Sequence, residues 1–253
     1  TKHLSTIVNP YPLVIKPFGA FAILVEWPPR VEESILDDIL QFSQYLKNHQ
    51  SINEKDWELV PAYNSLLLSH VKNQIDFKEM KIQIENWYSS KDPVVLPQKF
   101  LWRLPVCYDA EFGIDLEEVS SALGLGIEDI IDLHVKQPYL VYGIGFLPGF
   151  MYLGGLPKAL EVSRKATPRQ KVQKGAVGLA GKQTGIYPQE SPGGWNIIGN
   201  CPIPIFDVEQ EDPCFVSVGD RIQFYKISKA EYDLNRIEGE VGIYKLEKIK
   251  IDA

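Results

Sequence analysis

The sequence predicts an α+β protein in which a small α/β domain precedes a mostly-β domain that we expect to be barrel-like. Its 253 residues are 45% hydrophobic and 23% charged, an ordinary globular balance that leaves room for two modest cores. Glycine is unevenly distributed, because 12 of the 19 glycines fall between Gly143 and Gly199. Since glycine supplies the positive φ angles of tight turns, this stretch favours short strands joined by turns.

The first 90 residues alternate between strand and helix patterns. An apolar run at 21–27, which two prolines follow, predicts a buried strand. A helix is predicted over 31–48, where apolar residues recur at steps of three and four. Two strands are predicted within 57–70 and a second helix over 75–88. Together these elements predict a β-α-β-β-α module.

The stretch that begins at Ser89 is the most linker-like part of the chain. It is polar, and several prolines follow, up to Pro97 and Pro105. The domain boundary is therefore expected there. We expect an N-terminal α/β domain at 1–90, a linker at 91–105 and the mostly-β domain at 106–253.

Two short helices are predicted near the start of the second domain. Asp115 can cap a helix over 116–123, and a Gly-Ile-Glu-Asp sequence at 126–129 begins another helix that ends near His134. A strand is predicted at 139–142, directly before the glycine-rich region.

Charge and the spacing of cysteines and histidines exclude several classes of protein. A net charge of −7 and a pI near 5.2 argue against a nucleic-acid partner, because phosphate-backbone affinity needs clustered lysine and arginine. The three cysteines form no C-x-x-C pair and the four histidines show no ligand spacing, so we expect no metal site. The sequence contains neither the apolar region of a signal peptide nor the ~20 apolar residues of a membrane span. We therefore expect a cytoplasmic protein with no membrane partner.

Two glycine-rich segments invite comparison with phosphate-binding loops. The first begins Gly-x-Gly at Gly143, but Pro148 stands where the third glycine of a dinucleotide fingerprint belongs. In the second, a P-loop would need glycine at Ala176 and serine or threonine at Gln183. Neither segment is a nucleotide fingerprint.

The window between Val162 and Gln189 has an unusual charge. It contains no aspartate or glutamate in a chain that is acidic overall. Cations beside glycine-exposed backbone N–H groups favour a site for a carboxylate or phosphate. A solvated basic hairpin is the alternative interpretation. The basic residues of the window are Arg164, Lys165, Arg169, Lys171, Lys174 and Lys182.

The run from 183 to 196 is dense in polar side chains, and its prolines and glycines favour an irregular backbone. Loops of this kind on a rigid scaffold are typical of binding sites. Alternatively, these side chains close turns and fill the core. His134 likewise has two interpretations, either as a functional group or as a helix-end residue whose hydrogen bonds are satisfied. The polar residues of the run are Gln183, Thr184, Tyr187, Gln189, Glu190, Ser191 and Asn196.

Long motifs of the C-terminal half resemble one protein family. They are G-F-L-P-G-F-M-Y-L-G-G-L-P at 145–157, P-R at 168–169, G-A-V-G-L-A-G at 175–181 and Q-T-G-I-Y-P-Q-E-S-P-G-G-W-N-I-I-G at 183–199. These segments are similar to the B subunit of bacterial 5-oxoprolinase, in a family that includes the sporulation-kinase inhibitor KipI and the allophanate hydrolase subunit 1 domain. Segments at 60–67 and 105–117 also resemble the family, so the likeness extends over most of the chain.

The resemblance implies a cyclophilin-like β-barrel for the C-terminal domain, behind a small α/β domain. It also implies one component of an ATP-dependent 5-oxoprolinase that uses ATP with Mg²⁺. Such a component converts 5-oxo-L-proline to L-glutamate together with the C subunit, its main partner, and the A subunit, and it is inactive alone. Carried onto this sequence, the candidate catalytic residues are His134 and Glu190. The candidate substrate- and nucleotide-binding residues are Arg169, Lys182, Gln183, Thr184, Tyr187, Gln189, Ser191 and Asn196.

Two other functions stay open at this point. A KipI-like protein would inhibit a sensor histidine kinase through a docking groove, and a carboxyltransferase-type subunit would act on a urea or amide substrate. The polar, cation-rich loops favour a small anionic ligand over a peptide groove. The sequence departs from the family's usual residues at Gln173-Lys174 and at Asn200.

Overall fold

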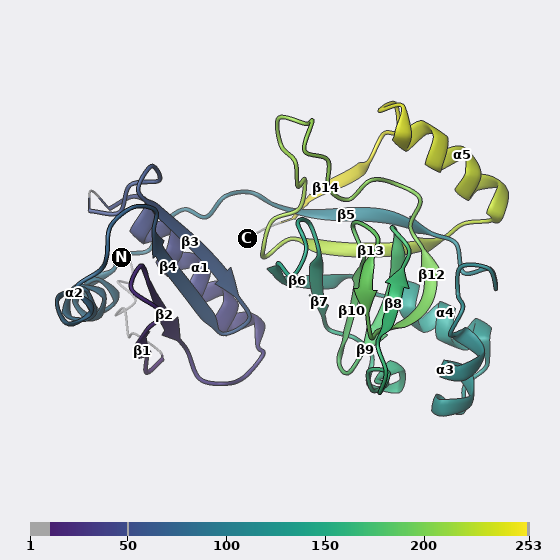
Figure 1. Cartoon of the computed structure of the whole chain (residues 1–253), viewed down its shortest axis with the longest axis horizontal. Helices are drawn as coiled ribbons and strands as arrows, with labels where there is room; N and C mark the ends of the chain where they lie inside the picture. The colour runs from purple at the N-terminus through teal and green to yellow at the C-terminus, as the bar shows by residue number, and fades with distance from the viewer. Residues whose placement is uncertain (1–10, 50, 252–253) are drawn as a thin grey trace, which may run out of the picture. The chain divides into compact units, whose positions relative to one another are not determined.

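A computed structural model describes residues 11–49 and 51–251, which form a mixed α/β structure with two compact units (Figure 1). Unit 1 ends at Pro97 and unit 2 begins at Gln98. The linker predicted at 91–105 is too long at its C-terminal end, because residues from Lys99 onward form a strand of unit 2. Pro105 can lie within this strand because the neighbouring strand at its outer edge pairs with it only as far as Arg103.

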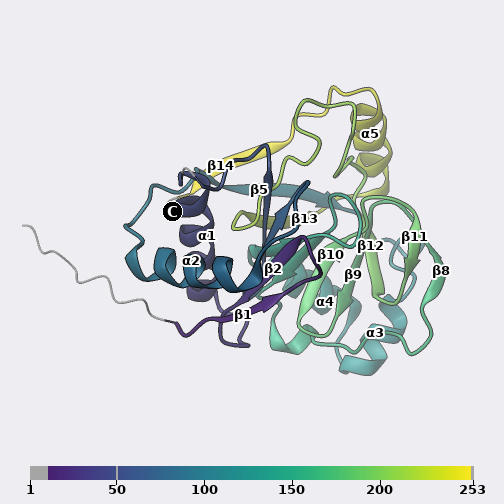
Figure 2. The same cartoon turned by 60° about the vertical axis from the view of Figure 1, so that its left-hand side comes forward.

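Unit 1 is a four-stranded antiparallel sheet with two helices, seen from a second direction in Figure 2. The predicted strands and helices are confirmed, and one further strand, β1, precedes them. Helix α1 buries Ile35, Ile39, Phe42 and Leu46, the residues whose spacing predicted it. The elements are β1 Val14–Pro17, β2 Ala22–Glu26, α1 Glu33–Lys47, β3 Trp57–Ala62, β4 Ser65–His70 and α2 Phe77–Ser90, in the sheet order β1-β2-β4-β3.

One largely buried carboxylate holds three parts of unit 1 together. Asp38 on α1 accepts hydrogen bonds from Trp27 Nε1 at 2.7 Å and from the Tyr88 hydroxyl at 2.6 Å. It also pairs with the ammonium of Lys91 at 2.5 Å. That ammonium lies 4.2 Å from the centre of the Tyr88 ring. The residue directly after α2 is therefore anchored in the core of unit 1.

Unit 2 is built on an eight-stranded sheet, with a separate two-stranded ribbon. Strand β5 lies inside this sheet, parallel to β13 and antiparallel to β14, although β13 follows it by more than a hundred residues. The large sheet has the order β12-β9-β10-β7-β6-β13-β5-β14, and the ribbon pairs β11 with β8. The strands are β5 Lys99–Val106, β6 Tyr139–Ile144, β7 Met151–Gly154, β8 Arg169–Val172, β9 Ala176–Ala180, β10 Gln183–Ile186, β11 Ser191–Gly193, β12 Asn196–Asn200, β13 Arg221–Lys226 and β14 Glu247–Ile251.

The expected closed barrel is not found among the described residues. The sheet rolls until Cys107, directly after β5, forms one bridge with Asn200 at the end of β12, through two N–H···O bonds of 2.9 Å. Pairing goes no further for two reasons. Strand β14 occupies an edge of β5, and Pro202 and Pro204, just after β12, lack the N–H groups that a ladder needs. The result is an open, rolled sheet pinned at one point.

Three α-helices accompany the sheet of unit 2. Their bounds are α3 Leu116–Leu123, α4 Ile127–Val135 and α5 Lys229–Glu240, and a short 3₁₀ turn covers Lys158–Leu160. The predictions for α3 and α4 are confirmed, but the proposed capping role of Asp115 is wrong, because its side chain makes no cap bond. Within the described residues, no helix is both long and apolar enough to cross a bilayer.

Candidate functional site

The carboxylate of Asp115 is the organising group of the candidate site. It is only 2% exposed, and it receives the guanidinium of Arg169 through two hydrogen bonds, of which the one from Nη1 is 2.9 Å. The backbone N–H of Ile197 donates to it at 2.7 Å, and the ammonium of Lys165 lies 3.0 Å away. These donors explain why the side chain does not cap α3, since charged partners are stronger than a helix N–H.

The same contacts determine the ionisation of Asp115. Burial alone would raise its pKa, but the bonds from Arg169, Ile197 and Lys165 outweigh burial and hold the pKa below its usual value. Asp115 is therefore a carboxylate at neutral pH. Its negative charge fixes the plane of the Arg169 guanidinium, and the arginine side chain is still 29% exposed.

A pocket of 220 Å³, which we call the Arg169 pocket, lies beside this pair. Its polar groups include the side chains of Arg169, Lys171, Glu111 and Asn200. Asn200 is held in place by donating to the Lys174 carbonyl at 3.0 Å and by accepting from a tyrosine hydroxyl at 3.0 Å. The pocket can therefore offer a small ligand both cationic groups and apolar side chains. Its lining is Glu111, Phe112, Ile114, Arg169, Lys171, Val172, Gln173, Ala176, Ile197 and Asn200.

Half of the cations in the basic window are already paired with acids from other segments or strands. Lys165 bonds to Glu118 at 2.6 Å in addition to Asp115, and Lys171 bonds to Glu190 at 2.8 Å. Arg164, Lys174 and Lys182 have no ion-pair partner among residues 11–49 and 51–251. The excess of positive charge that the sequence shows in this window is therefore partly neutralised in the fold by acids from other segments.

The predicted site residues do not converge on one point. Of the ten, only Arg169 lines the Arg169 pocket, although Glu190 reaches it through its bond to Lys171. Lys182 lies in the turn after β9, while the pocket contacts Ala176 at the other end of that strand, roughly 15 Å away at ~3.3 Å per residue. Gln183 is partly exposed at the start of β10, and Gln189 is exposed.

The other polar residues of the 183–196 run are buried. Asn196 donates to the carbonyls of Ser163 at 2.8 Å and of Leu179 at 3.2 Å, and Ser191 donates to a neighbouring carbonyl. Burial raises the pKa of Tyr187, which packs edge-on against Phe150. For these residues the geometry favours the alternative that they hold the loops and the core.

His134 lies at the centre of a closed hydrogen-bond chain. Thr184 donates its hydroxyl to the Gly178 carbonyl at 3.1 Å, so His134 Nε2 donates to Thr184 at 2.9 Å. Nδ1 then accepts from the Tyr108 hydroxyl at 2.7 Å. Full burial lowers the pKa of His134 to about 3 and keeps the ring neutral. Because it is 0% exposed and does not line the Arg169 pocket, its geometry is that of the satisfied helix-end residue.

Sequence reasoning misses two acids at the site. Glu111 lines the Arg169 pocket, and Asp115, for which the sequence predicts a capping role, orients Arg169 from outside the lining. No local signal identifies them, because 111–115, Arg169 and Asn200 come from distant parts of the chain. The sequence departs from the family's usual residues at Asn200, which lines the pocket, and this departure is the one relevant sequence signal.

Comparisons with known proteins agree with this fold. Residues 13–216 match the family model described as carboxyltransferase domain, subdomain C and D. The chain is 37% identical over 185 residues to the 5-oxoprolinase B subunit of Bacillus subtilis (strain 168), with 69% of this chain and 77% of the relative covered. It is 35% identical over 210 residues to the Haemophilus influenzae B subunit, with 83% and 96% covered.

The chain therefore belongs to the carboxyltransferase domains of the subdomain C and D type. Within that class it belongs to the family of 5-oxoprolinase B subunits. The structure of Kluyveromyces lactis urea carboxylase shares the fold, with a TM-score of 0.80 at 16% identity over 97% of this chain and 24% of that one. Another solved structure is 33% identical with a TM-score of 0.68, and 82% of this chain covers 39% of it.

Proposed function

We propose that the chain is one component of an ATP-dependent 5-oxoprolinase that converts 5-oxo-L-proline to L-glutamate. Its partners are the C subunit, the main one, and the A subunit, and the chain is inactive alone. The observation that carries the proposal is the 35% identity to a 5-oxoprolinase B subunit of which the chain covers 96%. A likeness over nearly the whole relative supports a shared role better than a shared motif does.

Within this function, the Arg169 pocket is the proposed contact for the substrate carboxylate. An arginine has five N–H donors, and the two bonds to Asp115 leave three of them for a ligand. The guanidinium is already oriented by Asp115, so binding need not order a flexible side chain. Phe112 and Ile114 supply apolar contacts for the carbons of a small ring. Glu190, beside Lys171, stays the candidate for proton transfer at the pocket's edge.

The Arg169 pocket does not fit ATP with Mg²⁺. At 220 Å³ the Arg169 pocket is smaller than the ~300–1,000 Å³ of usual ligand pockets. The residues that the structure describes contain no group of three or more His, Cys, Asp or Glu side chains placed to hold a metal ion. We therefore assign the nucleotide to the assembled complex.

The decisive experiment measures glutamate formation and 5-oxoproline-dependent ATP hydrolysis with the cognate A and C subunits. We expect activity only when this chain is added. Arg169→Lys keeps a cation for Asp115 but removes the planar fork, so KM for 5-oxoproline should rise about tenfold. Arg103→Lys is the matched control, since Arg103 pairs with Glu247 outside the pocket. Glutamate formation without the chain would contradict the function, and an unchanged KM in Arg169→Lys would contradict the pocket.

A carboxyltransferase acting on a urea or amide substrate is the second candidate, because the matched family model is described as a carboxyltransferase domain. The same complex distinguishes the two. Carboxyl transfer from a carboxylated biotin to a urea-type acceptor, with no glutamate released from 5-oxoproline, would favour the second candidate.

A further inference from the structure

Helix α5 presents an apolar face that nothing in unit 2 covers. Leu234, Ile237 and Val241 are 56%, 52% and 62% exposed, and Ile243 just beyond the helix is 65% exposed. The steps of three and four residues place the first three side chains on one side of the helix. Single exposed apolar residues are common on protein surfaces, but a contiguous group of them marks an interaction site.

The opposite side of α5 attaches the helix to unit 2. The ring of Tyr232 lies 4.2 Å from that of Phe112, and Gly239 allows the backbone to approach Pro204 closely. At 3.6 residues per turn, positions 232 and 239 lie within about 20° of each other, whereas the centre of the 234, 237 and 241 group lies about 180° away. The apolar face therefore points away from the body of unit 2.

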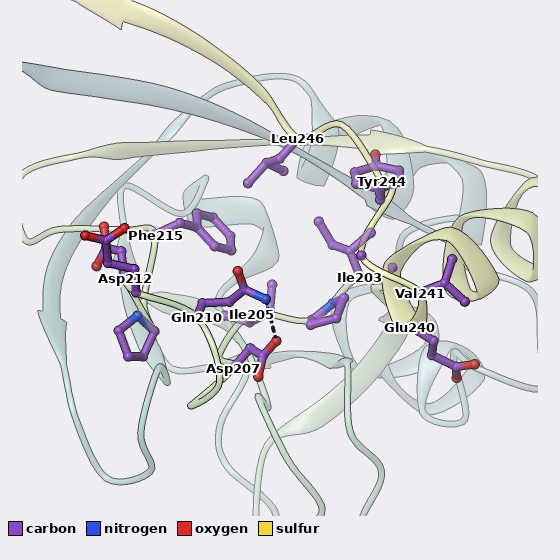
Figure 3. A pocket seen from close by; sticks show the side chains of 15 residues that line it. Ile203, Ile205, Asp207, Gln210, Asp212, Phe215, Glu240, Val241, Tyr244 and Leu246 are labelled. Atoms are coloured by element: carbon purple, nitrogen blue, oxygen red, sulfur yellow. Dashed lines mark hydrogen bonds between the residues drawn. The ribbon is translucent and has the colours of Figure 1, made fainter.

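A pocket of 550 Å³ adjoins the C-terminal end of this face, and we call it the Phe215 pocket (Figure 3). Val241 both lines the pocket and ends the apolar face, so the two form one continuous surface. The pocket and the exposed face of α5 are together called the α5 surface below. The larger apolar side chains around the pocket are Ile203, Ile205, Phe215, Val241, Tyr244 and Leu246.

The charged groups of the Phe215 pocket all have the same sign. Its lining contains Asp207, Glu211, Asp212 and Glu240, and no lysine or arginine. Figure 3 shows Asp212 and Glu240 on opposite sides of the space. Glu240 is paired with Arg236 at 2.7 Å, whereas Glu211 and Asp212 have no ion-pair partner in the part of the chain that the structure describes. The pocket thus combines apolar walls with a negative rim in which Glu211 and Asp212 carry no ion-pair partner among the described residues.

We propose that the α5 surface binds a segment of another protein in the same complex, one that carries apolar side chains flanked by lysine or arginine. Apolar walls favour the first feature, and the negative rim favours the second by charge complementarity. The same rim would repel an anionic membrane surface or a nucleic acid. The inference rests on the proposed function in one respect, that the partner is another component of the 5-oxoprolinase.

The test measures the affinity of this chain for the cognate A and C subunits by titration calorimetry. The double variant Leu234→Asp/Ile237→Asp should bind at least about thirtyfold more weakly, because interface cores tolerate charges poorly. Ile82→Asp on α2 is the matched control, since Ile82 is a similarly exposed helical isoleucine, at 59%. Glu211→Gln/Asp212→Asn should weaken binding about threefold to tenfold at low salt and less at high salt.

A second measurement does not depend on variants. A carbodiimide joins a carboxylate to a lysine amine in contact with it through an amide bond. The carbodiimide takes up the water that is lost and becomes a urea derivative. In the complex we expect Glu211 or Asp212 to be joined to a lysine of the bound protein, and crosslinks exclusively through carboxylates outside the α5 surface would overturn the proposal.

Each further outcome has a distinct meaning. If the unaltered chain binds neither of the other components, the proposed function fails. If the unaltered chain binds and the double variant binds equally well, the inference about the α5 surface fails on its own. A double variant that changes the oligomeric state of the isolated chain would show that a second copy occupies the surface, and would overturn the proposal as well.

Discussion

Each unit of this protein contains a largely or fully buried aspartate that binds a cation, and the two pairs differ in what the cation can reach. Asp38 in unit 1 pairs with Lys91, and the side chains are only 12% and 9% exposed. Asp115 in unit 2 pairs with Arg169, whose side chain is 29% exposed and lines a pocket. The first pair is closed inside the core, whereas the cation of the second is accessible from a pocket.

The comparison shows that a buried carboxylate alone does not indicate function. In unit 1 the partners are two aromatic donors and a lysine that lies against an aromatic ring, which is a structural arrangement. In unit 2 the partner is an arginine, which keeps N–H groups free after a bidentate bond. The free donors and the exposure of the cation, rather than the burial of the acid, distinguish the pair that we propose as a binding site.

The largest effect is expected from Asp38→Ala. The substitution leaves a buried ammonium and two aromatic donors without a partner, so unit 1 should lose about 4 kcal/mol of stability. Hydrogen exchange resolved by peptide measures this loss in α1 and β4. A loss below about 1 kcal/mol would mean that Lys91 finds water or another acceptor.

Alkaline pH sharpens the difference between the two pairs. Burial lowers the pKa of Lys91, although Asp38 opposes this shift. Without Asp38, the pKa of Lys91 in the folded chain falls further below its pKa in the unfolded chain. At a pH between these two pKa values the unfolded chain binds more protons than the folded chain, so the stability of the variant rises with pH in that range. The Asp38→Ala variant should therefore recover part of its loss near pH ~10.

Asp115→Ala should destabilise unit 2 by about 3 kcal/mol, somewhat less than the first substitution, because water can solvate the exposed end of Arg169. Raising the pH should not restore this loss, since arginine stays protonated. Exchange in peptides of α3 and β12, measured at pH ~7 and pH ~10, tests both statements. Recovery at high pH equal to that of Asp38→Ala would remove the distinction between the pairs.

Acid should affect unit 2 before unit 1. His134 has a folded-state pKa of about 3 against 6.5 when unfolded, so below pH 6.5 the unfolded chain binds the extra proton and stability falls. Between about pH 7 and pH 5 unit 2 should lose about 2 kcal/mol, at about 1.36 kcal/mol per pH unit. His134→Gln, which cannot titrate, should show a flatter profile. An identical profile in the variant would assign the acid sensitivity to other groups.

The smallest effect is expected at the surface pair of Lys171 and Glu190. Their side chains are 68% and 54% exposed, and such pairs are worth at most about 1 kcal/mol. Glu190→Ala should change stability by under about 0.5 kcal/mol while it lowers turnover in the reconstituted complex. A variant with full turnover would remove Glu190 from the candidate catalytic residues.

The predictability of the two units follows the range of their contacts. In unit 1 two of the three strand pairs, β1 with β2 and β3 with β4, join strands that are consecutive or nearly so in the sequence, and the spacing of residues such as Ile35 and Ile39 predicts α1 without any remote contact. In unit 2 the pairing of β5 with β13 and the bridge from Cys107 to Asn200 join distant segments. No periodicity encodes such pairing, and the barrel was therefore expected where an open sheet is found.

The candidate site shows the same limit. Arg169 could be proposed because its charge stands out in the sequence, but its orientation depends on Asp115, and its pocket depends on Glu111 and Asn200. The aromatic and hydroxyl residues that surround His134 gave no sequence signal for a closed hydrogen-bond chain. Charge could be seen in the sequence, whereas its compensation by remote acids could not.

The position of β5 also has a consequence for how the protein is made. Phe100 donates its N–H to Asp220, 120 residues later, and β5 lies between β13 and β14 in the sheet. At the ~5–20 residues per second of protein synthesis, β5 waits roughly 6–24 s for β13, and longer for β14, to leave the ribosome. During that interval its two edges are unpaired, so a translational pause after β12 should make the nascent chain depend on chaperones, whereas unit 1 can already fold.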